Sequence, residues 1–290
     1  MDLDLLRQFG VLARAGSLEL AGEQLNLTAS AVSRSMRRLE TALDTSLFDR
    51  HGRALQLNAA GKRLLEESLP LLAQAERIAG SFKGTSSGFR CRIAGPARLH
   101  AHFARMPLQK LKKRFPKGEI AFSHDTQESA LQAVIAGDAQ FAVLANLESL
   151  PDSRLRSVAL GQASSVVAIS STHPLGSRRS VPVREVMQHD FVVPLDQPRT
   201  ATGGGGDGWR DDVFPRRHAW RTDDLTVAAG LVRAGVALSY LPDKMLPDLQ
   251  LHRLIVTGCP YRNVLSVSLV WREDLSTGWM QWLIGHLSSI

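Results

Sequence analysis

The amino-acid sequence predicts two folded parts, a small and mainly helical domain at the N-terminus and a larger α/β domain after it, with one long helix between them. Three observations support this fold class. Apolar residues recur at helical spacing up to Leu43, a spacing of three and four continues from Ala59 to Phe82, and strand-like and helix-like segments alternate from Arg90 onward. The length of 290 residues is usual for about two domains.

The N-terminal segment contains two short amphipathic helices joined by a tight polar turn, the layout of a helix-turn-helix. The first follows the N-cap Ser17 and carries apolar residues at i, i+3, i+4 and i+7, namely Leu18, Ala21, Gly22 and Leu25. The second begins after Thr28, and its inward stripe consists of Val32, Met36, Leu39 and Leu43. Its opposite face, which suits phosphates and base edges, bears Ser30, Ser33, Arg34 and Arg37. Periodicity alone fits an ordinary helix pair with a solvated basic face equally well.

The segments on either side favour the interpretation as a DNA-reading domain. Leu5, Phe9 and Leu12 predict a preceding helix that supplies the third wall of a small core. Residues 45–58 predict a short hairpin that is anchored by Leu47 and Phe48 and turns at residues 51–52. The hairpin would be a wing that contacts DNA phosphates through the residues flanking its turn, Arg50 and Arg53.

These residues resemble the DNA-binding domain of the LysR-type transcriptional regulators. The resemblance rests on residues 31–34, on Leu39 with Glu40, and on residues 47–50, 52–53 and 57–61. It implies a regulator that binds double-stranded operator DNA through Thr28, Ala29, Ser30, Ser33, Arg34, Arg37, Arg38, Arg50 and Arg53. The sequence departs from the family at Leu18 (usually Phe), Asn58 (usually Thr) and Ala29 with Ser30 (often Gln-Pro or Gln-Ser). The last departure lies at the start of the reading helix and allows a different operator sequence.

A single long helix is predicted from Ala59 to Phe82. Its apolar and small residues follow a heptad seam, which indicates a close contact between two helices: Leu65, Ser68, Leu72, Ala75, Ala79 and Phe82. Pro70 predicts a kink. An amphipathic helix that packs on its own domain is the alternative, but in the resembled family this helix is the dimerising linker. The resemblance therefore implies self-association through residues 59–82, as a dimer or a dimer of dimers, with residues 83–88 as a hinge.

The remaining sequence predicts a mainly parallel sheet with crossover helices. Strands are predicted at residues 90–94, 119–123, 141–145, 166–170, 191–193, 236–241 and 265–271, and helices at residues 103–115, 127–136, 225–234 and 279–287. We expect a winged helix-turn-helix domain at residues 1–58, a linker helix and hinge at 59–88, and an effector domain at 89–290. Its first lobe would comprise residues 89–161 and 265–290 and its second lobe residues 162–264.

The C-terminal part also resembles the family, more weakly, in residues 173–175, 228–231, 235–238 and 241–242. The resemblance implies two α/β lobes like those of periplasmic binding proteins, with a small ligand held between them. Strand-to-helix turns present free amides to such a cleft, which favours an anion. The residues in these turns are Ala97, Arg98, Leu99, His100, His124, Asp125, Asn146, Pro194, Asp196, Thr222 and Asp223.

Two of these turn residues, Arg98 and Asp223, have opposite charges and therefore favour ligands of opposite charge. Ala97 and Arg98 stand where the family often has a hydroxyl residue, and Arg98 is either a carboxylate ligand or a surface arginine. Asp223 argues against an anion unless Arg98 or Arg221 neutralises it, or the ligand also carries an amine.

The net charge of +7 does not come from the DNA-binding part. Residues 1–60 contain seven arginines and seven acidic residues, whereas residues 83–118 contain ten basic residues and no acidic one. The basic run at 105–117 is best explained as a solvated helix face, with a secondary contact to DNA or attraction of an acidic ligand as alternatives.

The two cysteines, Cys91 and Cys259, lack disulfide or metal-ligand patterns, so we expect buried small residues, with a redox-responsive regulator as the alternative. Residues 203–208 contain G-x-G-x-x-G, but no hydrophobic strand precedes them and no Lys-Ser or Lys-Thr follows, which favours a mobile loop over the cleft.

The histidines are scattered and no Gly-x-Ser-x-Gly elbow is present, so the sequence predicts a regulator without enzymatic activity, cofactor or metal. The acidic start and the lack of a long apolar run predict a cytoplasmic protein that does not enter the membrane.

Overall fold

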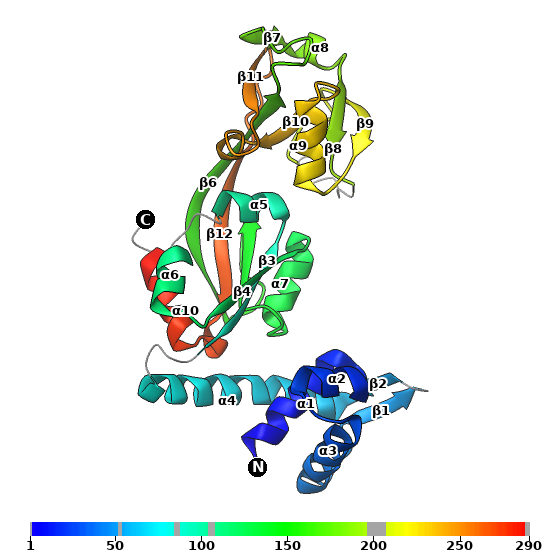
Figure 1. Ribbon diagram of the computed structural model, residues 1–290, viewed down its shortest axis with the longest axis vertical. Helices are drawn as coiled ribbons and strands as arrows, with labels where there is room; N and C mark the ends of the chain where they lie inside the picture. Colours follow the sequence, from blue (N-terminus) through cyan, green and yellow to red (C-terminus); the bar gives the residue numbers. More distant parts are fainter. Residues whose placement is uncertain (1, 52–53, 84–87, 104–107, 196–206, 288–290) are drawn as a thin grey trace. The chain divides into compact units, whose positions relative to one another are not determined.

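The computed structural model describes residues 2–51, 54–83, 88–103, 108–195 and 207–287. The chain forms two compact units, Met1–Gly88 with Arg272–Trp282 and Phe89–Trp271 with Leu283–Ile290. Figure 1 shows their helices and strands.

The first unit begins with three helices, α1 (Leu3–Ala15), α2 (Leu18–Leu25) and α3 (Ala29–Leu43). The predicted N-caps are confirmed, because Ser17 Oγ accepts a hydrogen bond from the Leu20 amide and Thr28 Oγ1 accepts one from the Ala31 amide, both at 3.2 Å. The turn between α2 and α3 passes through Asn26, which has a φ of 55°. The buried stripes of the three helices form the core: Leu5, Leu6, Phe9, Leu12, Ala21, Val32, Met36, Leu39 and Leu47.

The predicted wing is present as two antiparallel strands, β1 (Phe48–His51) and β2 (Ala54–Leu57). Two side-chain hydrogen bonds hold the base of the wing in place. Glu40 Oε1 accepts a hydrogen bond from the Leu47 amide at 2.8 Å, and Asn58 Nδ2 donates one to the Ser46 carbonyl at 2.9 Å. Asn58 also caps the next helix, since its Oδ1 accepts from the Gly61 amide at 2.9 Å. Asn58 therefore links the base of the wing to the start of α4.

The long helix α4 (Ala59–Lys83) continues through Pro70. The predicted seam is only partly available to a second helix, because Leu65 and Leu72 pack against the N-terminal core and Ser68 is buried. At these three positions the helix packs on its own domain, which was the alternative to a dimer contact. A neighbouring apolar residue, Leu71, is 42% exposed.

The second unit begins with a first lobe of alternating strands and helices. Its elements are β3 (Arg90–Gly95), α5 (Ala97–Phe103), α6 (Leu108–Arg114), β4 (Glu119–His124), α7 (Gln127–Ile135) and β5 (Phe141–Ala145), with α10 (Gly278–Leu287) at the end of the chain. Of the helix predicted at 103–115, Phe103 ends α5 and residues 108–114 form α6, while residues 104–107 lie outside the described part of the chain. The basic residues of α6 are exposed while Leu111 is buried, which confirms a solvated helix face for that part of the basic run.

The second lobe contains more elements than the sequence predicted. These elements are β7 (Ser180–Pro182), α8 (Val183–Val186), β8 (Asp190–Val193), β9 (Arg217–Arg221), α9 (Leu225–Arg233), β10 (Ser239–Pro242), the short helix η2 (Asp243–Met245) and β11 (His252–Thr257). Five of them, β7, α8, β9, η2 and β11, were not predicted.

Two strands, β6 (Leu155–Ile169) and β12 (Val264–Arg272), run from one lobe into the other, and the short helix η3 (Glu273–Leu275) follows β12. They are neighbours in the sheet order β4-β3-β5-β12-β6-β11-β7, and β10 also pairs with β6. The expectation of a mainly parallel sheet is wrong at this centre. Although β3 is parallel to β4 and β5, β12 is antiparallel to β5, and β10 and β11 are antiparallel to β6.

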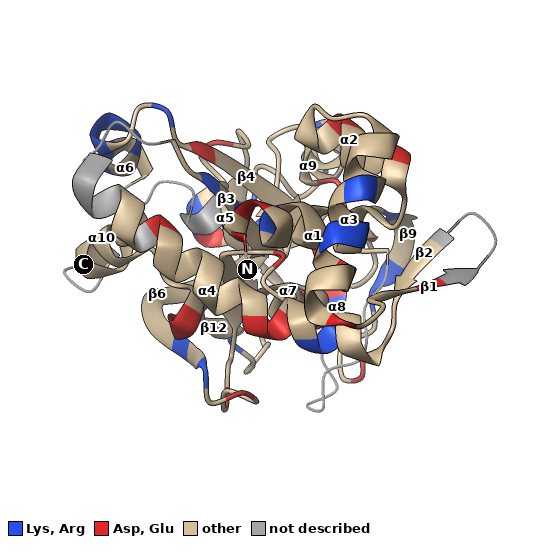
Figure 2. Ribbon diagram, turned by 90° about the horizontal axis from the view of Figure 1, so that it is seen from below, with Lys and Arg blue, Asp and Glu red and all other residues tan. Residues whose placement is uncertain are grey.

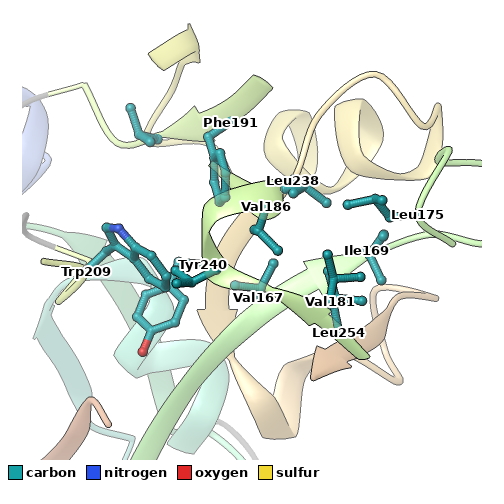
Figure 3. Close-up of a cluster of buried hydrophobic side chains, with 12 residues drawn as sticks. Val167, Ile169, Leu175, Val181, Val186, Phe191, Trp209, Leu238, Tyr240 and Leu254 are labelled. Carbon is teal, nitrogen blue, oxygen red and sulfur yellow. The ribbon is translucent and has the colours of Figure 1, made fainter. Parts of the chain in front are cut away.

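Each lobe has its own apolar core. The first lobe buries Ala94, Ala130, Val134, Ala142, Leu144 and Val270, among others. In the second lobe, Figure 3 shows a cluster that joins β6, β8, β10 and β11 through Val167, Phe191, Tyr240 and Leu254. Trp209 extends this cluster toward the edge of the lobe, where its ring lies 5.1 Å from that of Tyr240, centroid to centroid.

The close contact between Gly61 and the wing gives a test of the N-terminal fold. A Cβ at residue 61 would lie 2.2 Å from the Leu47 carbonyl oxygen and 2.8 Å from Leu57 Cδ2. Gly61→Ala should therefore lower the free energy of unfolding of this domain by about 1–3 kcal/mol, measured by urea titration. The control is Gly10→Ala in α1, where the nearest atoms are the Arg14 guanidinium nitrogens at 3.9 Å and stability should hold or rise. Equal midpoints for Gly61→Ala and the wild type would contradict this packing.

Candidate functional site

The exposed face of α3 carries the residues predicted to contact DNA. Val32, Met36 and Leu39 are buried on one side of the helix, while Arg34, Arg37 and Arg38 are exposed on the other, and Figure 2 shows the basic residues of α3 in blue. Among the described residues none of these three arginines forms an ion pair. Their guanidinium groups are therefore available to phosphate oxygens and to bases.

The start of α3 presents hydroxyl groups beside these arginines. Thr28 and Ser30 are exposed and their hydroxyl oxygens lie 3.0 Å apart, while Ala29 and Ser33 are half-buried. The wing is held against the core by Phe48, whose ring lies 5.6 Å from that of Phe9. The side chain of Arg50 and the whole of Arg53, the predicted wing contacts, fall outside the described part of the chain.

The second predicted site centres on Arg98, which is the second residue of α5 and follows β3 directly. Its Nε atom is buried and has no hydrogen-bond partner in the described structure. Burial lowers the pKa of Arg98, while the negative charges of Asp207 and Asp223 act against that shift. The buried Nε argues against a simple surface arginine, and the charges of two carboxylates of the second lobe act on the guanidinium.

The turn at Thr222 and Asp223 is tied to the end of β8. The Thr222 amide donates to the Val193 carbonyl at 2.9 Å, Asp223 Oδ1 accepts from the Leu195 amide at 3.0 Å, and the Arg221 guanidinium donates to the Leu195 carbonyl. The Asp223 carboxylate is thus partly satisfied within its own lobe. Pro194, in the same connection, is half-buried, and Asp196 lies outside the described residues.

The expectation that helix starts leave free amides in the cleft is wrong at two helices. Asp224 Oδ1 accepts from the Thr226 and Val227 amides at the start of α9, and these bonds lower the pKa of Asp224. Thr126 caps α7 in the same way by accepting from the Ser129 amide. Side-chain caps therefore occupy amides that an anion would need.

Several predicted effector residues do not join the group around Arg98. Leu99 is 1% exposed, and His100 packs edge-on against Phe122 with ring centroids 5.2 Å apart. His100 lines a small apolar cavity of about 30 Å³ within the first lobe, and burial lowers its pKa. Both side chains are therefore buried within the first lobe.

The turns after β4 and β5 are occupied by structural hydrogen bonds. Asp125 Oδ2 accepts from Ser123 Oγ at 2.5 Å and from Arg92 Nη2 at 3.3 Å, while His124 is exposed. Asn146 has a φ of 51°, and its Oδ1 accepts from the Ser266 amide of β12 at 3.0 Å. Asn146 therefore closes a turn against β12.

A buried ion cluster was missed by the sequence reasoning. Arg216 donates to Asp207 Oδ2 at 2.7 Å and to Asp211 Oδ2 at 2.6 Å, and the side chains of Arg216 and Asp207 are 2% and 5% exposed. Burial alone would lower the pKa of Arg216, but the hydrogen bonds and charges of these two carboxylates raise it. The only signal in the sequence was Asp207 itself, inside a glycine-rich run interpreted as a loop.

The cysteines differ in environment. Cys91 is buried on β3, and burial raises the pKa of its thiol to about 12, which keeps it protonated and argues against redox chemistry there. Cys259 is half-buried, with its Sγ 3.8 Å from the Tyr261 carbonyl oxygen. Both cysteines are free thiols.

The N-terminal domain is a winged helix-turn-helix whose second helix carries unpaired arginines. The domain that follows has two lobes, and charged residues of the second lobe act on Arg98 of the first. These two features define a class of ligand-responsive DNA-binding proteins. Residues 3–62 match the model of the bacterial regulatory helix-turn-helix protein, lysR family, and residues 86–289 match the LysR substrate binding domain. The chain therefore belongs to the LysR family. It is a sequence-specific transcriptional regulator with an effector-binding domain, and the family is one of regulators rather than enzymes.

Relatives resemble the chain along its whole length. The HTH-type transcriptional regulator AceR of Acinetobacter baumannii is 28% identical over 96% of this chain and 93% of its own length. A full-length OxyR variant of Pseudomonas aeruginosa has a TM-score of 0.67 with 15% identity, covering 100% of this chain and 94% of that one. LysG of Corynebacterium glutamicum, solved with bound effector Arg, has a TM-score of 0.62 with 15% identity, covering 100% and 97%. At these identities the solved structures show the shared fold.

The described residues contain neither a membrane-spanning helix nor a metal-binding cluster. No helix there is long and apolar enough to span a membrane. No group of three or more metal-ligating side chains gathers in the same residues.

Proposed function

We propose that this protein reads a double-stranded operator with α3 and the wing, self-associates through α4, and responds in the bacterial cytoplasm to a small anionic effector held between the lobes around Arg98. The observation that carries the proposal is the division of α3 into a buried apolar stripe and an exposed face with three unpaired arginines. A structural neighbour, CbnR, was solved in complex with its target DNA, with a TM-score of 0.52 and 18% identity, covering 100% of this chain and 99% of that one. This supports the same use of the shared fold here.

Arg34→Ala should weaken binding to an operator fragment by at least about tenfold, because it removes a charged donor from the reading face without touching the core. The fragment is selected with the wild-type protein, and affinities are compared by fluorescence anisotropy at one salt concentration, since phosphate contacts depend on salt. The control is Arg63→Ala on α4, an exposed arginine paired with Glu67 at 2.8 Å, which should bind like the wild type. If Arg34→Ala binds the fragment with unchanged affinity, Arg34 does not contact the operator.

The effector assignment is supported by the buried, unpartnered Nε of Arg98. A guanidinium in this state gains most from a carboxylate, which accepts two parallel hydrogen bonds. Asp223 opposes an anion, but its carboxylate already accepts from the Leu195 amide, and its charge is opposed by Arg98. A ligand that binds one closure of the lobes better than another would shift the equilibrium between them by that difference in affinity.

Arg98→Gln should abolish the thermal stabilisation produced by small carboxylates. A panel of mono-, di- and hydroxycarboxylates is screened by thermal shift on the full chain, and the most stabilising compound is titrated against the variant and the wild type. Saturation at about 100 times Kd adds about 2.7 kcal/mol to stability, which is readily detected. The control Arg90→Gln on β3, where Arg90 is exposed, should respond like the wild type. If no carboxylate stabilises the wild type, or if Arg98→Gln responds equally, the anion assignment fails.

Self-association is proposed to use the exposed side of α4 rather than the seam positions that pack on the N-terminal core. Leu71, which is apolar and 42% exposed, is one candidate on this helix, and Ile78, 54% exposed, is another. One helix-turn-helix covers only a short half-site, so pairing two of them adds their binding energies on adjacent turns of DNA.

Leu71→Asp should dissociate the oligomer, because it places a charge in an apolar helix contact. Light scattering on the full chain measures the mass, and anisotropy measures the operator affinity, which should fall with it. Lys62→Gln changes the charge of α4 by the same amount at another exposed position and should leave both readouts unchanged. An unaltered mass for Leu71→Asp would exclude this side of α4 from the interface.

A further inference from the structure

A pocket in the second lobe is separate from the group around Arg98. It has a volume of about 180 Å³, which is roughly the space of six water molecules at ~30 Å³ each. Its walls are formed by the segment after Asp207, by β10 and by the connection from β11 to β12. The residues that decide its chemistry are Trp209, Phe214, Tyr240, Tyr261, Arg210 and Arg262.

The pocket is rich in aromatic rings that pack edge to face. The ring of Trp209 lies 5.1 Å from Tyr240, and that of Phe214 lies 6.1 Å from Tyr261, centroid to centroid. Figure 3 shows Trp209 beside Tyr240, with the Tyr240 hydroxyl directed away from the apolar cluster. Trp209 is 5% exposed, whereas Tyr261 is 43% exposed and offers the accessible ring surface for a further planar group.

The charges in the lining are positive. Arg210 lies over the Tyr261 ring at 4.7 Å and is already neutralised by Asp212, with two contacts of 2.7 Å. Arg262 is exposed and forms no ion pair with any described residue, and no carboxylate is among the described residues of the lining. One guanidinium at the pocket is therefore left for an anion from outside.

The framework of the pocket is held in place without a ligand. Asn263 Nδ2 donates to the Asp207 carbonyl at 3.0 Å, and Trp209 Nε1 donates to the Phe214 carbonyl at 2.8 Å. Gly208 has a φ of 86°, and a Cβ there would lie 1.9 Å from Asn263 Nδ2, so the backbone approaches this amide closely. A preformed cavity avoids much of the ordering cost of binding.

We propose that this pocket is a second ligand site that takes a small aromatic carboxylate of one ring. The ring lies against the exposed part of Tyr261, and the carboxylate pairs with Arg262. An aliphatic acid loses the ring contacts, and a bare inorganic anion leaves the aromatic walls exposed, so both bind more weakly. This site shares none of Arg98, Thr222 or Asp223 with the proposed effector site and does not depend on it.

The test is ¹⁹F NMR of 4-fluorobenzoate titrated with the full-length protein. We expect saturable binding, weakened by about tenfold or more in Arg262→Gln, because a charge-assisted hydrogen-bond pair is lost. Tyr261→Ala should weaken binding similarly, whereas Tyr261→Phe keeps the ring and should bind like the wild type. Arg262 and Tyr261 are exposed, so these variants are expected to fold, and their thermal unfolding is compared with that of the wild type.

Two controls separate this pocket from the rest of the surface and from the other site. Arg253→Gln, on β11 and exposed, and Arg98→Gln should both retain the wild-type affinity for the probe. The proposal is overturned if no saturable binding occurs below about 10 mM, if Arg262→Gln binds normally, or if Arg98→Gln removes the binding. The last result would assign the probe to the space between the lobes.

Discussion

The second lobe depends on the buried cluster in which Arg216 holds Asp207 and Asp211. Breaking such a pair by removing one partner costs about 3–5 kcal/mol, because the other charge is left without water or a counter-ion. The Arg216 guanidinium also lies over the rings of Phe191 and Trp209, at 5.5 and 5.6 Å. The cluster thus fixes both the charge balance and the aromatic packing of this lobe.

Asp207 connects this cluster to three parts of the molecule. Its carboxylate accepts from the Trp209 amide at 3.1 Å, its carbonyl accepts from Asn263 before β12, and its charge acts on Arg98 of the first lobe. A single acidic residue therefore lies between the aromatic pocket and the proposed effector site. Any rearrangement of Arg98 changes the balance of charge around Asp207.

The N-terminal domain could be predicted almost completely, because its signals are local. Helical spacing, the caps Ser17 and Thr28, and the hairpin pattern all depend on residues close in sequence. The apolar pattern on α4 is equally local, and it reports an apolar face but not which surface covers it. Leu65 and Leu72 meet their own domain.

The α/β domain was predicted less well because its contacts are distant in sequence. Only the last part of β6 was expected, since its first part alternates irregularly between buried and exposed residues as it leaves one lobe for the other. The turns after the strands indicated both Arg98 and Asp223, and the negative charge of Asp223 acts on the pKa of Arg98. They could not indicate that Leu99 turns inward, that Asp224 caps α9, or that Arg216 is buried, because each depends on side-chain direction or on tertiary packing.

The pairing of β6 with β12 has a consequence for how such a chain can vary. The second lobe is entered along one of these strands and left along the other, and the Ser165 amide donates to the Asn263 carbonyl at 3.1 Å where they meet. The lobe is thus an insertion whose two ends are already side by side. Recombination between relatives could exchange it as one cassette, with its pocket and its carboxylates, while the first lobe and its arginine stay unchanged.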